Sequence, residues 1–259
     1  MDHRDDAHKG PTQRALRGLR GLWLGQLGPM RAYAPGGNSV RRVARFDPTR
    51  ETVLLTQGLV QTRGVMEILE ARLRRDGFEV FSVHLGGFMG TYNTRPIPVI
   101  ARHVLGKIRR LRARYGLGRI HMIGHSKGGL IGRYMLQILG GEEHVKTLIT
   151  LGTPHRGTPT AWLVSAPVLR QIMPSGPEMV PGSEVLEALQ GAPMPADTRV
   201  VSIFSRTDLI CPYWCSWVDP SGGGRVRNLM VQGQGHTELL SDRRVYRLLK
   251  AELRPPPGL

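Results

Sequence analysis

The amino-acid sequence predicts an α/β fold in which a mostly parallel sheet of about six strands carries helices on both faces. Short apolar runs alternate with helix-like stretches over most of the chain, which is the pattern of strands joined by crossover helices. At one strand–helix junction the chain reads Gly-x-Ser-x-Gly, which indicates a tight turn. With 259 residues, 40% of them hydrophobic, the chain can bury one large core.

The first two strands and helices follow from apolar periodicity. Thr52–Thr56 is a short apolar run that predicts a buried strand. Val65–Arg75 places its apolar residues on one helical face and ends at an Asp-Gly pair, so we expect a helix there. Phe78–Leu85 predicts the next strand, and Pro98–Tyr115 predicts a long helix whose outer face is rich in arginine.

The rest of the chain continues this alternation. The apolar run that begins at Ile120 predicts a strand that enters the Gly-x-Ser-x-Gly turn. Proline, glycine and isolated apolar residues interrupt the pattern over residues 156–197, where we expect a cap or lid. The remaining elements are expected at Leu130–Leu139 (helix), Thr147–Leu151, Val200–Phe204 and Val226–Val231 (strands), and Asp242–Leu253 (helix).

These patterns divide the chain into an N-terminal extension (1–50), one domain (51–254) and a short tail (255–259). The extension opens with about a dozen polar residues, for which we expect disorder. From Arg14 to Met30, apolar residues recur at helical spacing among arginines, as in an amphipathic helix that lies on an anionic membrane. Four glycines in this stretch weaken a helix, and packing against the domain is the alternative.

The chain is strongly basic, since 36 Lys and Arg residues against 20 Asp and Glu give a formal charge of +16. This charge favours partners that carry phosphate, such as an anionic membrane surface. The basic residues lack interleaved aromatic side chains, so we expect no specific nucleic-acid binding. No apolar run approaches the ~20 residues of a membrane span, and charges interrupt the region where a signal peptide would be apolar. We therefore expect a cytoplasmic protein, with peripheral membrane contact as the alternative.

The cysteines do not suggest a metal site or a disulfide framework. Cys211 and Cys215 are the two cysteines of the chain, and their CPYWC spacing is neither that of a redox pair nor that of a zinc site. Free thiols are the expectation, and one local disulfide in an oxidising compartment is the alternative. We expect chemistry that needs no cofactor and no metal.

Ser126 is the candidate nucleophile because it stands at the centre of the pentapeptide. A serine on a strained turn exposes its hydroxyl above the sheet while the strand and helix nearly touch, so only glycine fits at Gly124 and Gly128. The backbone N–H of Lys127 would then point at the oxygen on which negative charge develops. The alternative is that Ser126 merely caps the helix.

A catalytic serine needs a base to take its proton and an acid to orient that base. In this kind of fold they follow in the order Ser, Asp or Glu, His, and Asp208 and His236 each come just after a predicted strand. Because the carboxyl ends of parallel strands meet at one edge, we expect both beside Ser126. The second oxyanion donor should come from the loop after the first strand, where we select the N–H of Leu59.

Other residues compete for the roles of acid and base. Asp219 lies in a loop rich in Pro, Ser and Gly, and Asp242 is placed to cap the last helix. His155 precedes the cap segment and the acid Asp208, which breaks the order along the chain. His125 lies inside the pentapeptide, where its side chain should point away from the serine hydroxyl.

At these residues the chain resembles the α/β-hydrolase lipases, specifically the bacterial triacylglycerol lipase and esterase group. The resemblance rests on the stretches VLLTQGLV, GHSKGGLIGRY, LITLGTPHRGT, SRTDLICP and VQGQGHTELL, which occur in the family's order. It implies an α/β-hydrolase fold with Ser126 as nucleophile, Asp208 as acid and His236 as base. Two departures stand out: Gln57-Gly58 replaces the usual His-Gly, and Cys211-Pro212 replaces the usual Val-Pro.

We therefore expect a serine hydrolase that cleaves carboxylic esters, such as lipid or acyl esters, through an acyl-enzyme intermediate. Two other functions stay open at this point. The same triad could transfer the acyl group to an alcohol or amine, or cleave a thioester. The chain could instead be a non-catalytic basic binding protein on a hydrolase scaffold.

Overall fold

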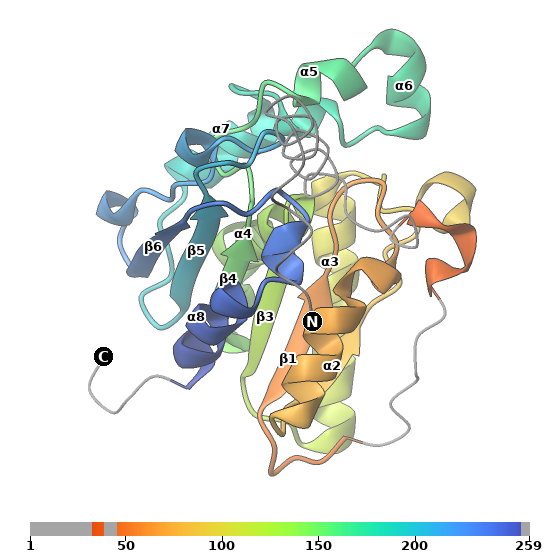
Figure 1. The fold of residues 1–259 in the computed structure, drawn as a ribbon. Coiled ribbons are helices and arrows are strands. Elements are labelled where there is room, and N and C mark those ends of the chain that lie inside the picture. Colours follow the sequence, from red (N-terminus) through yellow and green to blue (C-terminus); the bar gives the residue numbers. More distant parts are fainter. Residues whose placement is uncertain (1–32, 39–45, 255–259) are drawn as a thin grey trace, which may run out of the picture.

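The computed structural model describes residues 33–38 and 46–254, and within them six strands form one sheet (Figure 1). The strand order is β2-β1-β3-β4-β5-β6, and every neighbouring pair is parallel. The predicted α/β fold is therefore confirmed. The strands are β1 (Thr52–Thr56), β2 (Glu79–Ser82), β3 (Ile120–His125), β4 (Val145–Leu151), β5 (Arg199–Ser205) and β6 (Arg225–Val231).

Helices pack on both faces of this sheet. Residues of α2 and α8 join one buried cluster, whereas residues of α3, α4 and α7 join the other. Two short helices, α5 and α6, project from the domain (Figure 1). The helices are α2 (Glu67–Arg75), α3 (Ile97–Tyr115), α4 (Lys127–Leu139), α5 (Ala161–Val164), α6 (Pro167–Ile172), α7 (Glu184–Gly191) and α8 (Arg243–Leu253).

The strand β1 contributes side chains to the buried clusters on both faces of the sheet. Successive strand residues point to opposite faces of a sheet. Leu54 accordingly packs with α3 and α4, while Val53 and Leu55 pack with α2 and α8. All three side chains are fully buried, and the unbroken apolar run is explained by a parallel strand covered on both faces.

Most predicted elements differ from the structure by one to three residues at their ends, and three of them show why. The strand expected at Phe78–Leu85 is confined to Glu79–Ser82, although the chain stays buried beyond it because its apolar side chains continue into the core. The helix expected from Val65 begins with a 3-10 turn at Arg63–Met66 and becomes α-helical at Glu67. The strand expected at Thr147–Leu151 begins two residues earlier, where Val145 pairs with Ile120.

The order of the strands fixes where a ligand can bind. The chain passes from β1 to β2 on one side, and then crosses over through α3 to β3 on the other side of β1. The connections therefore run to opposite sides of β1 at this point, and ligands of parallel α/β sheets bind outside the carboxyl ends of the strands at such a switch point. The Gly-x-Ser-x-Gly turn follows β3 at this edge.

The structure does not test the predictions made for several segments. The amphipathic stretch Arg14–Met30 and the tail 255–259 lie outside the described residues. The segment 156–197 contains α5, α6 and α7, and its role as a lid stays a prediction. Among the residues that the structure describes, none of the helices is both long enough and apolar enough to span a bilayer.

Candidate active site

Ser126 occupies a strained turn between β3 and α4. Its backbone has φ 52° and ψ −125°, a conformation that side-chain-bearing residues rarely adopt and that marks functional sites. The turn brings the strand and helix into contact: a Cβ on Gly124 would lie 2.5 Å from the Gly128 carbonyl carbon, and one on Gly128 would lie 2.3 Å from the Thr56 carbonyl oxygen. Both glycines are thus sterically required.

The hydrogen bonds around Ser126 hold its backbone and leave its hydroxyl out of the helix cap. The Ser126 N–H donates to the Leu151 carbonyl at 2.9 Å, and the Thr153 hydroxyl donates to the Ser126 carbonyl at 2.9 Å. Ser126 stands at the N-cap position of α4, but its side chain makes no capping hydrogen bond. The alternative that this serine merely caps the helix is therefore wrong.

Asp208 and His236 form a buried pair. Asp208 Oδ2 lies 2.7 Å from His236 Nδ1, and the two side chains are 0% and 6% exposed. The other carboxylate oxygen, Oδ1, accepts the backbone N–H groups of Ile210 and Cys211 at 2.9 and 2.8 Å. With every carboxylate oxygen engaged, Asp208 is fixed as a hydrogen-bond acceptor for the Nδ1–H of His236, and this leaves Nε2 as the nitrogen suited to take a proton.

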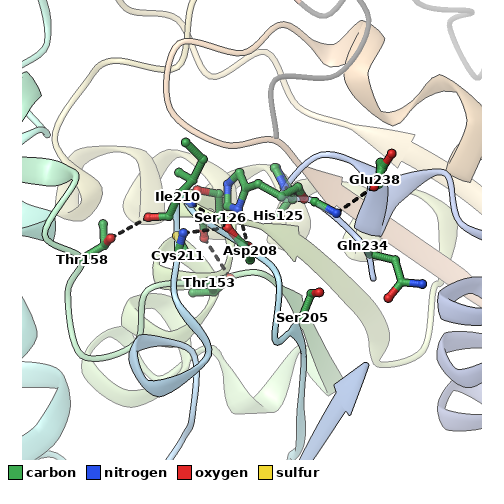
Figure 2. A network of polar contacts seen from close by, with 12 residues as sticks. His125, Ser126, Thr153, Thr158, Ser205, Asp208, Ile210, Cys211, Gln234 and Glu238 are labelled. Atoms are coloured by element: carbon green, nitrogen blue, oxygen red, sulfur yellow. Dashed lines mark hydrogen bonds and ion pairs between the residues drawn. The ribbon is translucent and has the colours of Figure 1, made fainter. Parts of the chain in front are cut away.

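The structure brings this pair to the same edge of the sheet as Ser126. Figure 2 shows Ser126, His125 and Asp208 gathered together, with Cys211 beside them. Cys211 links the two sides, because its backbone N–H holds Asp208 while its thiol contacts the Ser126 hydroxyl. Burial raises the pKa of the Cys211 thiol well above its usual value, and its hydrogen bond with Ser126 acts in the opposite direction. Cys211 and Cys215 are both buried free thiols.

The competing residues have other partners. Asp219 is exposed and accepts the backbone N–H of Ser221, and Asp242 caps α8 by accepting the N–H groups of its first turn. His155 is buried beside the Thr150 hydroxyl, with its Nε2 2.9 Å from Thr150 Oγ1. None of these three contacts Ser126 among the interactions of the described residues.

The loop after β1 approaches the serine closely. A Cβ on Gly58 would lie 2.9 Å from the Ser126 Cβ, so only glycine lets this loop come so near. The Gly58 N–H donates to Gln61 Oε1 at 2.9 Å, whereas the Leu59 N–H donates to no other described residue. Lys127 follows Ser126 as the first residue of α4, where helix N–H groups lack intrahelical partners. The arrangement suits an oxyanion site between Leu59 and Lys127.

Comparison with known proteins assigns this fold to a family. The family model described as alpha/beta hydrolase fold matches residues 51–184 of the chain. The chain belongs to the α/β hydrolase fold family. This match covers β1 to the start of α7, and so includes the strained serine turn but neither Asp208 nor His236.

Two relatives of this α/β hydrolase are triacylglycerol lipases. The one from Pseudarthrobacter phenanthrenivorans is 29% identical over 119 residues, which are 44% of this chain and 36% of the relative. The one from Burkholderia plantarii is also 29% identical over 119 residues, 44% of this chain and 32% of the relative. The matched region thus spans about a third of the length of these curated relatives.

Solved structures share the fold at low sequence identity. The mature Bacillus licheniformis lipase BlEst2 has a TM-score of 0.65 at 14% identity, covering 82% of this chain and 96% of that one. The esterase EaEST from Exiguobacterium antarcticum has a TM-score of 0.63 at 16% identity, covering 79% and 92%. These similarities extend the hydrolase fold beyond the residues matched by the family model.

The Lys127 side chain, whose role was not predicted from the sequence, connects two parts of the hydrolase site. Its Nζ is fully buried and donates to Asn93 Oδ1 at 3.0 Å, to the Asn93 carbonyl at 3.2 Å and to the Arg95 carbonyl at 2.6 Å. Asn93 Nδ2 in turn donates to the Gln57 carbonyl at 2.7 Å. A buried chain of contacts therefore joins the helix that follows Ser126 to the loop that carries Leu59.

Burial leaves this lysine poorly stabilised as a cation. Desolvation lowers the pKa of Lys127 to about 7, and the attraction of Glu178 opposes that shift. Burial likewise raises the pKa of Glu178, whose carboxylate accepts the Ile97 N–H at the start of α3. A lysine at this position gave no signal in the sequence, because a charged side chain is ordinarily expected to be exposed.

His125 also contacts the loops of the candidate site, although the sequence predicted no catalytic role for it. Its Nδ1 lies 3.0 Å from Gln61 Oε1, and its Nε2 lies 3.1 Å from the His236 carbonyl. Burial, with the nearby His236, lowers the pKa of His125 well below its usual value. The buried ring packs between the loop after β1 and the loop that bears His236, with the centres of the two histidine rings 4.6 Å apart.

No group of three or more His, Cys, Asp or Glu side chains in residues 33–38 and 46–254 is arranged to hold a metal ion.

Proposed function

We propose that this α/β hydrolase cleaves carboxylic esters, with Ser126 as nucleophile, His236 as general base and Asp208 as the group that orients His236. The observation that carries the proposal is the strained serine turn beside a buried carboxylate–imidazole pair. The same constellation of serine, histidine and aspartate supports acyl transfer on several unrelated folds. The curated relatives are triacylglycerol lipases, which agrees with this reaction class.

The proposed reaction has two halves. His236 Nε2 takes the proton of the Ser126 hydroxyl as its oxygen bonds to the ester carbonyl carbon, and the carbonyl π electrons move onto oxygen. When the tetrahedral intermediate collapses, the carbon–alkoxy bond breaks and Nε2 protonates the departing alcohol. Water then attacks the acyl-enzyme with Nε2 again as base, which releases the carboxylic acid and restores Ser126.

The oxyanion is stabilised by the backbone N–H groups of Leu59 and Lys127. Each such donor supplies roughly 10²–10³ in kcat in serine hydrolases. Gln57 replaces the histidine usual in this loop, and the loop is held instead through Asn93 and Gln61. The donors are main-chain groups, so their position matters and the identity of the side chain at 57 does not.

The substrate we propose is a lipid ester presented at an interface. Trp162 and Leu163 on α5 and Val168 on α6 are 64%, 74% and 78% exposed. The segment that leads into α5 lies against the loop that carries Asp208, because the Thr158 and Thr160 hydroxyls donate to the Ile210 carbonyl. Large apolar side chains exposed next to a catalytic loop are suited to contact an aggregated apolar substrate. We therefore propose that residues 156–197 act as the cap of the site.

The decisive experiment measures turnover of p-nitrophenyl esters from acetyl to palmitoyl by the wild type and by Ser126→Ala, with Ser221→Ala as a matched control. We expect turnover by the wild type and Ser221→Ala, and a loss of at least about 10³-fold in Ser126→Ala. Covalent labelling by a fluorophosphonate should follow the same pattern. Absence of both turnover and labelling in the wild type would refute the proposed chemistry.

The interface is tested separately with Leu163→Asp and Val168→Asp, using Leu248→Asp on α8 as the control, since Leu248 is also partly exposed. The two cap variants should lose activity on emulsified ester but keep it on a short soluble ester. If Leu248→Asp lost as much activity on emulsified ester as the two cap variants, or if the cap variants lost none, the proposed contact between cap and lipid would be refuted. The hydrolase assignment would survive that outcome.

A further inference from the structure

We propose that a cavity between α4, α7 and the loop 217–222 is a second binding site, which takes a small organic anion with a carboxylate or phosphate group. The cavity measures about 560 Å³, within the range of small-molecule sites. Ser126, Asp208 and His236 do not line it. Its lining includes Arg133, His155, Arg156, Met194, Trp217 and Asp219.

The inner wall of this cavity holds a buried cation. Arg133 is 5% exposed, and its guanidinium donates to Gln137 Oε1 at 2.8 Å and to the Leu189 carbonyl at 2.8 Å. These partners are neutral, and no carboxylate of the described residues forms an ion pair with Arg133. Burial lowers the pKa of Arg133 to about 10, so the side chain still carries its charge at neutral pH. A buried charge whose partners are all neutral is not compensated by an opposite charge, and an anion bound beside it would stabilise it.

His155 does not supply the missing negative charge. Its Nδ1 lies 3.5 Å from Arg133 Nη1, and its Nε2 lies 2.9 Å from Thr150 Oγ1. A guanidinium only donates hydrogen bonds, so Nδ1 must be the unprotonated nitrogen. Burial and then the charge of Arg133 lower the pKa of His155 well below its usual value. The histidine is therefore neutral, and the inner wall carries a net positive charge.

The mouth adds a second cation and an aromatic wall. The Arg156 guanidinium lies 4.6 Å from the centre of the Trp217 ring, and Arg156 itself is exposed. The acid on the lining, Asp219, is exposed, and its pKa is lowered by its hydrogen bonds with Ser221 and, to a smaller extent, by the charge of Arg156. It therefore lies near the cation at the mouth, and it forms no ion pair with Arg133. Met194 and Leu189 give the cavity an apolar side. Two arginines with an aromatic and an aliphatic wall match an anion on a compact apolar body.

The fluorescence of Trp217 offers a direct test. Hexanoate and phenyl phosphate would be titrated into the Ser126→Ala protein, with hexanamide and phenol as the uncharged analogues. Ser126→Ala removes turnover, so the titration reports the cavity whether or not the proposed esterase chemistry is correct. Trp217→Phe identifies the part of the signal that comes from this ring.

We expect saturable binding of at least one anion, weaker binding of its uncharged analogue, and loss of the signal in Trp217→Phe. Arg156→Ala should weaken binding at least about tenfold, because a charge-assisted hydrogen bond is lost. Arg170→Ala, which removes an exposed arginine from α6, should bind like the parent. Which anion saturates decides whether the group recognised is carboxylate or phosphate.

The proposal is overturned if neither anion saturates, or if Arg156→Ala and Arg170→Ala weaken binding equally, which would indicate only attraction to a basic surface. Arg133→Met provides the second variant. It should abolish binding, and if it unfolds the chain instead, the comparison of Arg156→Ala with Arg170→Ala still decides the matter.

Discussion

The buried contact from Lys127 through Asn93 to Gln57 makes a sharp prediction about the oxyanion site. Asn93→Ala removes the 2.7 Å hydrogen bond to the Gln57 carbonyl and the 3.0 Å hydrogen bond from Lys127 Nζ. A neutral buried hydrogen bond contributes about 1 kcal/mol and one to a charged group about 1.5–3 kcal/mol. The free energy of unfolding should therefore fall by about 2.5–4 kcal/mol.

The catalytic effect should exceed what destabilisation alone produces. Without Asn93 the loop that carries Leu59 loses its link to α4, so one of the two oxyanion donors is no longer held in place. Full loss of a donor costs roughly 10²–10³ in kcat, and a loosened donor should cost about 10–100-fold, with little change in KM. Kinetics on a soluble p-nitrophenyl ester measure kcat and KM, and urea unfolding measures stability.

Two further variants separate positioning from stability. Asn93→Asp keeps an acceptor for Lys127 but cannot donate to the Gln57 carbonyl, so it should lose kcat while losing less stability than Asn93→Ala. Asn228→Ala breaks two hydrogen bonds with the main chain of Val218, away from the site, and should lower stability while leaving kcat unchanged. If Asn93→Ala kept kcat within about twofold of wild type, the positioning role would be refuted.

Three other outcomes are expected. Asp208→Asn should lower kcat by roughly 10³–10⁴ in the ester assay, because the amide favours the wrong tautomer of His236; a loss below tenfold would point to another acid. Because burial lowers the folded-state pKa of Lys127 to about 7 from 10.5, the unfolded chain binds more protons between these pH values. The free energy of unfolding should therefore rise with pH in that window, and Lys127→Met should remove that contribution to the slope in urea titrations at several pH values. Gly128→Ala places a Cβ 2.3 Å from the Thr56 carbonyl oxygen, so Tm should drop and activity vanish; near-wild-type melting would contradict this packing.

Local chemistry explains why much of the fold was predictable. β1 coincides with the predicted run Thr52–Thr56. A strand of a parallel sheet is buried on both faces, so it appears in the sequence as a short unbroken apolar run between polar residues. Asp242 was expected to cap the last helix, and it accepts two N–H groups of α8. The strand expected at Phe78–Leu85 was too long, since burial continues beyond Ser82 and apolarity alone does not mark where hydrogen bonding to β1 stops.

The sequence by itself determined the order of strands and helices, the serine turn with its two obligatory glycines, and the order Ser126, Asp208, His236. Each depends on neighbours in the chain, so periodicity and spacing carry the information. Only the tertiary structure decided that Lys127 points inward to Asn93, that His125 packs against His236, and that Arg133 lines a cavity without forming an ion pair to any carboxylate of the described residues. Those roles depend on segments tens of residues apart, and a side chain's charge or burial is fixed by the partners that the packed fold supplies.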